Sequence, residues 1–325
     1  MQAITFAQPG GPEVLQLATA PDPTPTAEQI LVRVRATALN RADTLQRRGA
    51  YPPPPGESEI LGLELAGEVE DVGAAVTNVK PGDRVCALVG GGGYAEKAVF
   101  DARMAIPIPD SWSFTDAAAV PEVFFTAQET MFTLGNLKAG ETVLIHAAAS
   151  GVGTAGIQMA REVGAKVLVT AGSAEKIRRC LELGAHAGCN YKEQDFAEWV
   201  KETTSGQGVD LIEDFVGAPY WERNLRSLKT CGRLVLVGTM GGVKVETSLL
   251  LIMSKRLQIF GSVLRARPLA EKIEVTRRFQ ERWLPLLASG RIKPIIDTVF
   301  PLAQAAEAHR HMEENRNFGK IILSV

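Results

Sequence analysis

A glycine-rich segment near the middle of the chain has the residue types and spacing that bind a diphosphate. Residues 151–156 read Gly-Val-Gly-Thr-Ala-Gly, with an apolar run ending at His146 before them and a helical pattern from Thr154 after them. Glycine at these places permits the tight turn, the approach of backbone to a pyrophosphate and the packing of helix on strand. The N-terminus of the helix offers free N–H groups and positive charge. We predict a dinucleotide site; the alternative is a glycine-rich turn without a ligand.

The tip of the next expected strand indicates which dinucleotide is bound. In NAD-binding proteins a carboxylate follows the glycines by about 20 residues, but here residues 169–173 read Val-Thr-Ala-Gly-Ser. Ser173 and Lys176 open the following helix, and a hydroxyl beside a cation suits a 2′-phosphate. Glu175 is a counter-signal, and Ser173 is also a good helix N-cap without any ligand. We predict NADPH rather than NADH.

The elements that must position these residues fall into two kinds of sequence. The first third is β-rich and irregular, with alternating apolar and charged residues at 30–36 and no long helical period. From about residue 117, apolar strands alternate with helical patterns, which is typical of a parallel sheet covered on both faces. Helices are expected over about 154–163, 173–183 and 268–288. A final strand at 320–325 needs a partner from the first part, so we predict one domain formed by residues 1–123 and 267–325, interrupted by a dinucleotide-binding domain over 124–266.

Composition narrows the functional classes. The 325 residues carry 35 Lys and Arg against 37 Asp and Glu, a net charge of −2, which disfavours nucleic acid as a partner. The four cysteines have no CxxC spacing, so we expect small buried hydrophobes in a reducing, cytoplasmic compartment. No basic-then-apolar leader is present, and the apolar runs are too short to span a bilayer. A soluble enzyme is the expected class.

Several segments in order resemble one known family. They are Pro-Gly-Gly-Pro-Glu at 9–13, Ala-Leu-Asn-Arg-Ala-Asp at 38–43, the glycine-punctuated run 61–73, Pro-Gly-Asp at 81–83, residues 145–153 and Gly-Lys-Ile at 319–321. Together they resemble the zinc-independent quinone oxidoreductases of the medium-chain dehydrogenase/reductase superfamily, especially the zeta-crystallin-like and p53-inducible types. The resemblance covers essentially the whole chain. It implies a GroES-like, mostly β catalytic domain with an inserted Rossmann domain, a doubly wound parallel sheet.

The resemblance also implies the residues of the site. Asn40, Asp43 and Tyr51 match the positions around the reacting ring. The positions implied to bind NADPH are Thr126, Ser150, Gly151, Val152, Gly153, Gly172, Ser173, Lys176, Tyr191, Phe215, Gly238, Met240 and Ser262. Within this set, Thr126 is implied to hold the carboxamide, and Ser173, Lys176 and Tyr191 the 2′-phosphate. Relatives pair edge to edge through the Rossmann sheet, which implies a homodimer, or a dimer of dimers, through the strand 257–263.

Zinc is used by the related alcohol dehydrogenases, and a catalytic zinc needs about three Cys, His or carboxylate ligands. The family's first ligand position holds Asn40, and the Gly-His-Glu signature reads Gly62-Leu63-Glu64. The four histidines fall in Rossmann or C-terminal helical context and are interpreted as structural or surface residues. We expect no metal.

Quinone reduction requires mainly positioning of the acceptor beside the cofactor. The glycine run 90–93 either leaves room for a planar ring or is a flexible turn. Tyr51 either contacts the acceptor, donates a proton, or only packs. NADPH-dependent reduction of quinones, preferably ortho-quinones, is therefore the first hypothesis.

Two other functions stay open. An enoyl or ene reductase would use Tyr51 as proton donor to the substrate α-carbon, and a non-enzyme would sense the cofactor or bind RNA. The sequence does not decide the physiological acceptor, one- or two-electron transfer, or dimer against tetramer.

Overall fold

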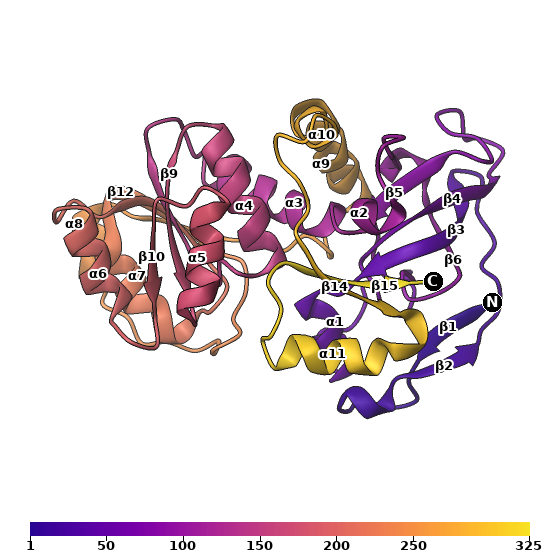
Figure 1. Ribbon diagram of the computed structural model, residues 1–325, viewed down its shortest axis with the longest axis horizontal. Coiled ribbons are helices and arrows are strands. Elements are labelled where there is room, and N and C mark those ends of the chain that lie inside the picture. The colour runs from indigo at the N-terminus through magenta and orange to yellow at the C-terminus, as the bar shows by residue number, and fades with distance from the viewer. The chain divides into compact units, whose positions relative to one another are not determined.

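The computed structural model describes all residues from Met1 to Val325. It divides into two compact units (Figure 1): unit 1 comprises Met1–Phe125 and Leu264–Val325, and unit 2 comprises Thr126–Val263. The chain therefore leaves unit 1 once and returns to it. None of the helices has the length and apolar character needed to cross a membrane.

Unit 1 is built on a seven-stranded sheet in the order β14-β15-β3-β4-β5-β7, with β6 also paired to β3. The strands are β3 (Gln29–Ala38), β4 (Glu64–Val72), β5 (Arg84–Leu88), β6 (Lys97–Asp101), β7 (Ile106–Pro107), β14 (Ile296–Pro301) and β15 (Lys320–Ser324), beside a separate pair, β1 (Gln2–Thr5) and β2 (Gln16–Thr19). The antiparallel register sets Ile322 opposite Ala38. Both ends of the chain thus contribute to one sheet, and the same register brings the start of β15 opposite the residues that follow β3.

Unit 1 contains helices of five to fourteen residues. They are α1 (Arg41–Arg47), α2 (Phe114–Ala118), α9 (Leu269–Arg282), α10 (Leu284–Ala288) and α11 (Ala305–Glu313), while α3 (Pro121–Ala127) leads into unit 2. The early helix α1 is not expected from periodicity, because two turns are too short for a repeating apolar pattern. The single helix expected over 268–288 is also wrong, since the segment breaks at Trp283 into α9 and α10.

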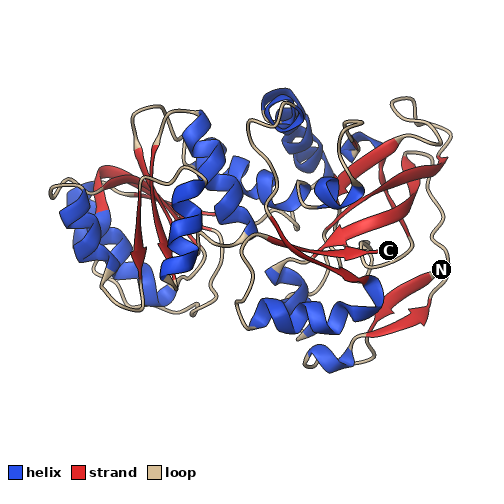
Figure 2. Ribbon diagram, viewed as in Figure 1, coloured by secondary structure: helices blue, strands red, loops and turns tan.

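Unit 2 is a six-stranded parallel sheet in the order β10-β9-β8-β11-β12-β13. Its strands are β8 (Thr142–Ile145), β9 (Lys166–Ala171), β10 (Ala187–Asn190), β11 (Val209–Asp214), β12 (Leu228–Leu236) and β13 (Gln258–Gly261). Helices α4 (Gly151–Glu162), α5 (Ala174–Glu182), α6 (Phe196–Thr203), α7 (Trp221–Ser227) and α8 (Leu249–Lys255) cover both faces, as Figure 2 shows. If these six strands are numbered 1 to 6 along the chain, their order across the sheet is 3-2-1-4-5-6. This is the Rossmann arrangement, in which ligands bind at the carboxyl ends of the strands.

Packing explains why unit 2 reads clearly in the sequence. Leu144, Leu168, Ile212 and Leu234, from four of its strands, lie in one fully buried core with Phe196 of α6. Strands buried on both faces need continuous apolar runs. One expectation about buried residues is wrong: Cys86, Cys180 and Cys189 are buried, but Cys231 is exposed, at a position in β12 where φ is +62°.

Candidate functional site

The predicted phosphate-binding turn lies between β8 and α4. Ser150 caps the helix, its side-chain oxygen accepting the N–H of Gly153 at 3.1 Å. A Cβ on Gly153 would lie 2.6 Å from the backbone of Ala148, so only glycine fits there. The N–H groups of Gly151 and Val152, in the first turn, have no carbonyl partner within the helix. Backbone donors at a helix N-terminus fit a diphosphate, as the sequence predicts.

The region expected to bind the 2′-phosphate follows β9. A Cβ on Gly172 would lie 2.7 Å from the hydroxyl oxygen of Tyr191, so the two residues are in close contact. Ser173 is the N-cap of α5 and accepts the backbone N–H of Lys176 at 3.3 Å. A hydroxyl that accepts in this way keeps its own hydrogen for another acceptor. The capping role and the ligand role of Ser173 are therefore compatible.

Glu175, the counter-signal in this region, forms an exposed ion pair within its own helix. Arg178 donates to both of its carboxylate oxygens, at 2.6 and 2.9 Å. This side-chain hydrogen bond lowers the pKa of Glu175 below its usual value. The carboxylate is thus paired one turn further along α5, which reduces its effect on an anion at the helix N-terminus.

The remaining predicted cofactor residues of unit 2 lie mostly at the carboxyl ends of its strands. The Met240 N–H donates to the Phe215 carbonyl at 3.2 Å, and a Cβ on Gly238 would lie 3.1 Å from that oxygen. The N–H of Ser262, just after β13, donates to Leu236 at 2.9 Å. Thr126 is the exception, since it lies in α3 and is nearly buried.

A buried polar chain that the sequence did not reveal holds the loop after β11. His146, wholly buried, bonds the Thr170 hydroxyl at 2.9 Å and the Asn224 Oδ1 at 2.8 Å, and Asn224 donates to Asp214 at 3.0 Å. Burial lowers the pKa of His146 to about 4 and raises that of Asp214 to about 6. The Asp214 carboxylate accepts the N–H groups of Val216 and of the residue after it. His146 is structural, as interpreted from the sequence.

In unit 1, the three side chains predicted to act on the reacting ring differ in accessibility. Asp43 is fully buried and accepts the N–H groups of Asn40 and Gly62, at 2.7 and 3.1 Å, and the hydroxyl of Tyr94 at 3.3 Å. Burial raises the pKa of Asp43 to about 6. Its oxygens are turned to protein donors, so Asp43 positions the Asn40 backbone rather than facing solvent.

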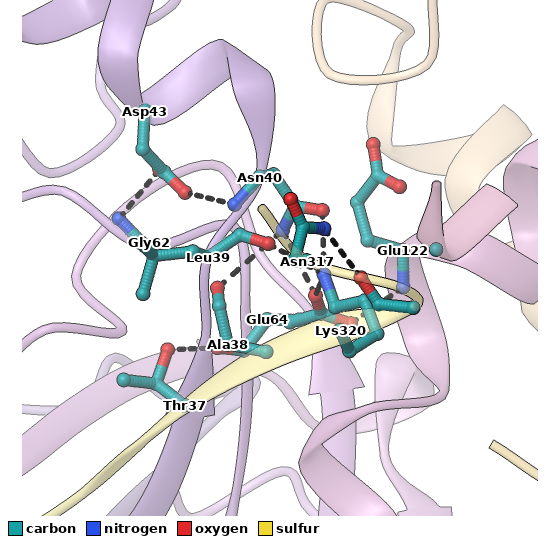
Figure 3. A network of polar contacts seen from close by, with 12 residues as sticks. Thr37, Ala38, Leu39, Asn40, Asp43, Gly62, Glu64, Glu122, Asn317 and Lys320 are labelled. Carbon is teal, nitrogen blue, oxygen red and sulfur yellow. Dashed lines mark hydrogen bonds and ion pairs between the residues drawn. The ribbon is translucent and has the colours of Figure 1, made fainter. Parts of the chain in front are cut away.

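Asn40 belongs to a second cluster, formed with Glu64 and Lys320 (Figure 3). Asn40 follows β3, Glu64 begins β4 and Lys320 begins β15. The Lys320 ammonium lies 2.7 Å from both the Asn40 Oδ1 and the Glu64 Oε1, and the Asn40 Nδ2 donates to the same Glu64 oxygen at 2.8 Å. Lys320 and Glu64 are nearly inaccessible to solvent, with side-chain exposures of 3% and 0%. Sequence reasoning missed Lys320, although it lies in the resembling segment 319–321.

A series of buried side chains, each donating a hydrogen bond to the next, ends at the Asp43 carboxylate. Arg47 can only donate, so the Nδ1 of His309, at 2.9 Å, must accept. The Nε2–H of His309 then donates to the Tyr94 oxygen at 3.2 Å, and the Tyr94 hydroxyl donates to Asp43. Burial lowers the pKa of His309 to about 3, so the ring is neutral. Each donor in this chain points toward the Asp43 carboxylate.

Tyr51, by contrast, is only partly buried, and its hydroxyl has no protein partner. The guanidinium of Arg265 lies 5.4 Å from the centre of its ring and donates to its carbonyl oxygen at 3.4 Å. The same guanidinium bonds the Gly90 carbonyl at 2.7 Å and Gln46 at 2.8 Å. Arg265, which the sequence did not suggest, therefore fixes the segment that carries Tyr51.

The glycine run 90–93 is packed against the segment 58–64. All four residues are buried. A Cβ on Gly91 would lie 2.3 Å from the Ser58 carbonyl oxygen, and one on Gly93 would lie 2.7 Å from that of Glu64. Gly91 and Gly93 therefore permit close packing of backbone on backbone, a reason for glycine that the sequence interpretation did not consider.

Comparison with known proteins agrees with this two-unit architecture. Residues 26–110 match the family model of the alcohol dehydrogenase GroES-like domain, and residues 151–281 match that of the zinc-binding dehydrogenases. An inserted Rossmann sheet beside a GroES-like domain defines the medium-chain dehydrogenases/reductases.

Among individual proteins, the quinone oxidoreductase of Rattus norvegicus is 35% identical over 99% of this chain and 97% of its own. The structure of Escherichia coli quinone oxidoreductase complexed with NADPH has a TM-score of 0.92, 34% identity and full coverage of both chains. A structure described as an NAD-dependent alcohol dehydrogenase has a TM-score of 0.88 and 34% identity, also with full coverage. The chain belongs to the quinone oxidoreductase family.

A zinc site, which the name of one matching family model suggests, does not fit the residues. No group of three His, Cys, Asp or Glu side chains in the structure is arranged to hold a metal ion. Two carboxylates lie next to Asn40: that of Glu64 is bonded to an ammonium, and that of Asp43 accepts the N–H groups of Asn40 and Gly62. A protonated amine cannot coordinate a cation, so this cluster is a poor metal site.

Proposed function

We propose that this chain reduces quinones, preferably ortho-quinones, with NADPH as the hydride donor and without a metal ion. The observation that carries the proposal is the geometry after β8 and β9: a helix N-terminus with free N–H groups, followed by a capping Ser173 at a strand tip that lacks a carboxylate. The full-length likeness to quinone oxidoreductases, one of them solved with NADPH, supports the same activity.

Each part of the cofactor has proposed partners in unit 2. Gly151 and Val152 hold the diphosphate through their free backbone N–H groups, in a turn shaped by Ser150 and Gly153, whose own N–H groups are bonded within the protein. Gly172, Ser173, Lys176 and Tyr191 surround the 2′-phosphate. Thr126 binds the carboxamide, and Phe215, Gly238, Met240 and Ser262 line the remainder. The bound cofactor supplies the hydride, while the protein supplies binding and orientation.

On the acceptor side, Asn40 and Tyr51 are the proposed contacts. The Tyr51 hydroxyl is without a partner, and the second hydrogen of the Asn40 Nδ2 has only the Ala38 carbonyl, at a long 3.5 Å. Asp43 acts through Asn40, whose backbone N–H it accepts. Because a reduced quinone is a stabilised phenolate that solvent protonates, orientation and two hydrogen-bond donors suffice without a metal.

A second candidate, ene reduction, is favoured by the free hydroxyl of Tyr51. In that reaction the hydroxyl would donate a proton to the substrate α-carbon. Tyr51→Phe separates the two activities. Loss of a general acid lowers ene reduction by about 10²–10⁴, whereas ortho-quinone reduction, whose product is protonated by solvent, keeps most of its kcat.

The experiment that tests the proposal is a screen of NADPH oxidation with ortho-quinones, para-quinones and enones, with semiquinone followed by electron spin resonance. We expect the fastest turnover with ortho-quinones; the radical signal distinguishes one- from two-electron transfer. Tight NADPH binding with no acceptor-stimulated oxidation would contradict the proposal and favour a cofactor-sensing protein.

The edge of the unit 2 sheet supports self-association. Within the six-stranded order β13 is terminal and pairs only with β12. Large apolar side chains are exposed there and on the preceding loop and helix: Met240, Val243, Val245, Leu249, Leu250, Met253 and Val263. We propose that a second copy pairs at this edge, giving a homodimer or a dimer of dimers. Light scattering of the wild type and of Leu250→Lys, expected to be monomeric, tests this.

A further inference from the structure

The ammonium of Lys320 has all three of its hydrogens in use inside unit 1. It donates to the Leu39 carbonyl, the Asn40 Oδ1 and the Glu64 Oε1, each at 2.7 Å. Taking a lysine out of water is costly, and the Lys320 side chain is only 3% exposed. Three charge-assisted bonds of this length hold the ammonium at one point.

The carboxamide of Asn40 is consequently fixed at both ends (Figure 3). Its oxygen accepts from Lys320, and its nitrogen donates one hydrogen to Glu64 at 2.8 Å. The reverse orientation would set an NH2 group against an ammonium, so the contacts determine which end is which. An ammonium on the oxygen withdraws electron density from the amide, which makes the remaining N–H hydrogen a stronger donor.

We propose that Lys320 is a positioning residue for the reduction: it orients and polarises the Asn40 carboxamide, whose second N–H hydrogen binds the acceptor oxygen. This rests on the proposed quinone reduction. When a quinone accepts a hydride, one of its oxygens becomes a phenolate, and a proton from solvent later neutralises it. A donor strengthened by a fixed positive charge binds the phenolate more tightly than the starting carbonyl, and that difference accelerates the step.

A purely structural role is the alternative, because the same cluster supports α3. The second carboxylate oxygen of Glu64 accepts the backbone N–H of Glu122 at 2.8 Å, in the first turn of that helix. Loss of Lys320 alone leaves a buried, unpaired carboxylate, which destabilises the unit whatever its role in the reaction. The test must therefore separate stability from rate.

Three variants make this separation. Lys320→Met removes the ammonium. Lys320→Met combined with Glu64→Gln removes both charges, so no unpaired carboxylate is left buried. Lys272→Met is the matched control, since Lys272 is also nearly buried in unit 1 and paired with a glutamate, Glu57 at 3.0 Å.

We expect both Lys320 variants to lose about tenfold in kcat with an ortho-quinone, less than the 10²–10³ lost when a donor contacting the oxygen is removed directly. The KM for NADPH stays unchanged. The double variant recovers the melting temperature that Lys320→Met loses, but not its kcat. The control loses stability only. Recovery of kcat together with stability in the double variant would overturn the proposal.

A second readout is independent of turnover and of cofactor. The side-chain amide resonances of Asn40, assigned by their loss in Asn40→Asp, report the bond to the ammonium in the protein alone. We expect them to move upfield in the double variant and to stay in place in Lys272→Met; unchanged resonances would refute the polarisation by Lys320. If the wild type reduces no quinone, the proposed function fails, while this measurement still tests the Lys320–Asn40 contact.

Discussion

The two units carry their functional residues in opposite ways. In unit 2 the residues proposed to bind phosphate are neighbours in sequence, Ser150 to Gly153 and Gly172 to Lys176, and both groups lie at a helix N-terminus. In unit 1 the cluster is formed by side chains that are far apart in sequence: Lys320 bonds Asn40, 280 residues away, and Glu64, 256 residues away. A site made from local backbone depends on glycine and a helix start, whereas a site made from distant side chains depends on the register of a sheet.

Two buried glutamates sharpen this contrast. Glu64 in unit 1 shares its carboxylate among an ammonium, an amide and a backbone N–H. Glu213 in unit 2, on β11, has one oxygen bonded to the Thr130 hydroxyl at 2.5 Å and the other without a partner. Burial without a cation raises the pKa of Glu213 to about 8. The first carboxylate is held by partners, and the second is kept neutral by its surroundings.

The largest effect that tests this comparison is expected at Glu64. Glu64→Ala leaves the Lys320 ammonium buried without its counter-charge and removes the carboxylate that accepts the Glu122 N–H. Removing one partner of a buried pair costs about 3–5 kcal/mol in the free energy of unfolding, measurable by urea denaturation followed by fluorescence.

The matched control for this loss is Glu274→Ala on α9. Glu274 is half-exposed and pairs with Arg277 at 2.7 Å on the helix surface. Solvent screens such a pair, so its removal should leave the unfolding midpoint close to that of the wild type. Equal losses for Glu64→Ala and Glu274→Ala would show that the buried cluster is not what holds this part of unit 1.

The same contrast explains which parts of the molecule could be predicted. The order of strands and helices in unit 2 follows from apolar runs and glycines, because both signals are local. The cluster of Glu64 and Lys320 could not be predicted, since it requires the pairing of β15 with β3. The segment 319–321 carried a signal in its family resemblance, but a lysine there gives no indication that it is buried. Tyr94 and Arg265 could not be predicted either, because their partners are also far away in the sequence.

A smaller effect is expected at the region proposed to bind the 2′-phosphate, where Ser173 caps α5 and is also a proposed ligand. Asp caps a helix as well as Ser does, so Ser173→Asp keeps the bond to the Lys176 N–H while setting a carboxylate at the strand tip. We expect the ratio of kcat/KM for NADPH over NADH to fall by about 100-fold, or about 2.7 kcal/mol, through repulsion of the 2′-phosphate.

Ser173→Asn is the control for this change, because it also caps the helix but adds no charge. Its cofactor ratio should stay within a few-fold of the wild type. An unchanged ratio in Ser173→Asp would mean that Ser173 only caps α5. Loss of activity with both cofactors in both variants would instead indicate damage to the turn itself.

The smallest effect concerns the lone carboxyl of Glu213. Its pKa in the folded protein, about 8, lies above the ordinary 4.5, so the folded state holds a proton that the unfolded chain releases. The resulting stabilisation is complete below the ordinary pKa and is lost as the pH rises through the folded value. Between about pH 6 and about pH 8 the wild type should lose about 2 kcal/mol relative to Glu213→Gln, whose amide does not titrate. Urea denaturation of the wild type and of Glu213→Gln at both pH values measures this loss. Asp43 and Asp214 titrate in both proteins, so the difference between the two proteins reports Glu213 alone. A difference in stability that does not change with pH would mean that the Glu213 carboxyl is ionised in the folded protein.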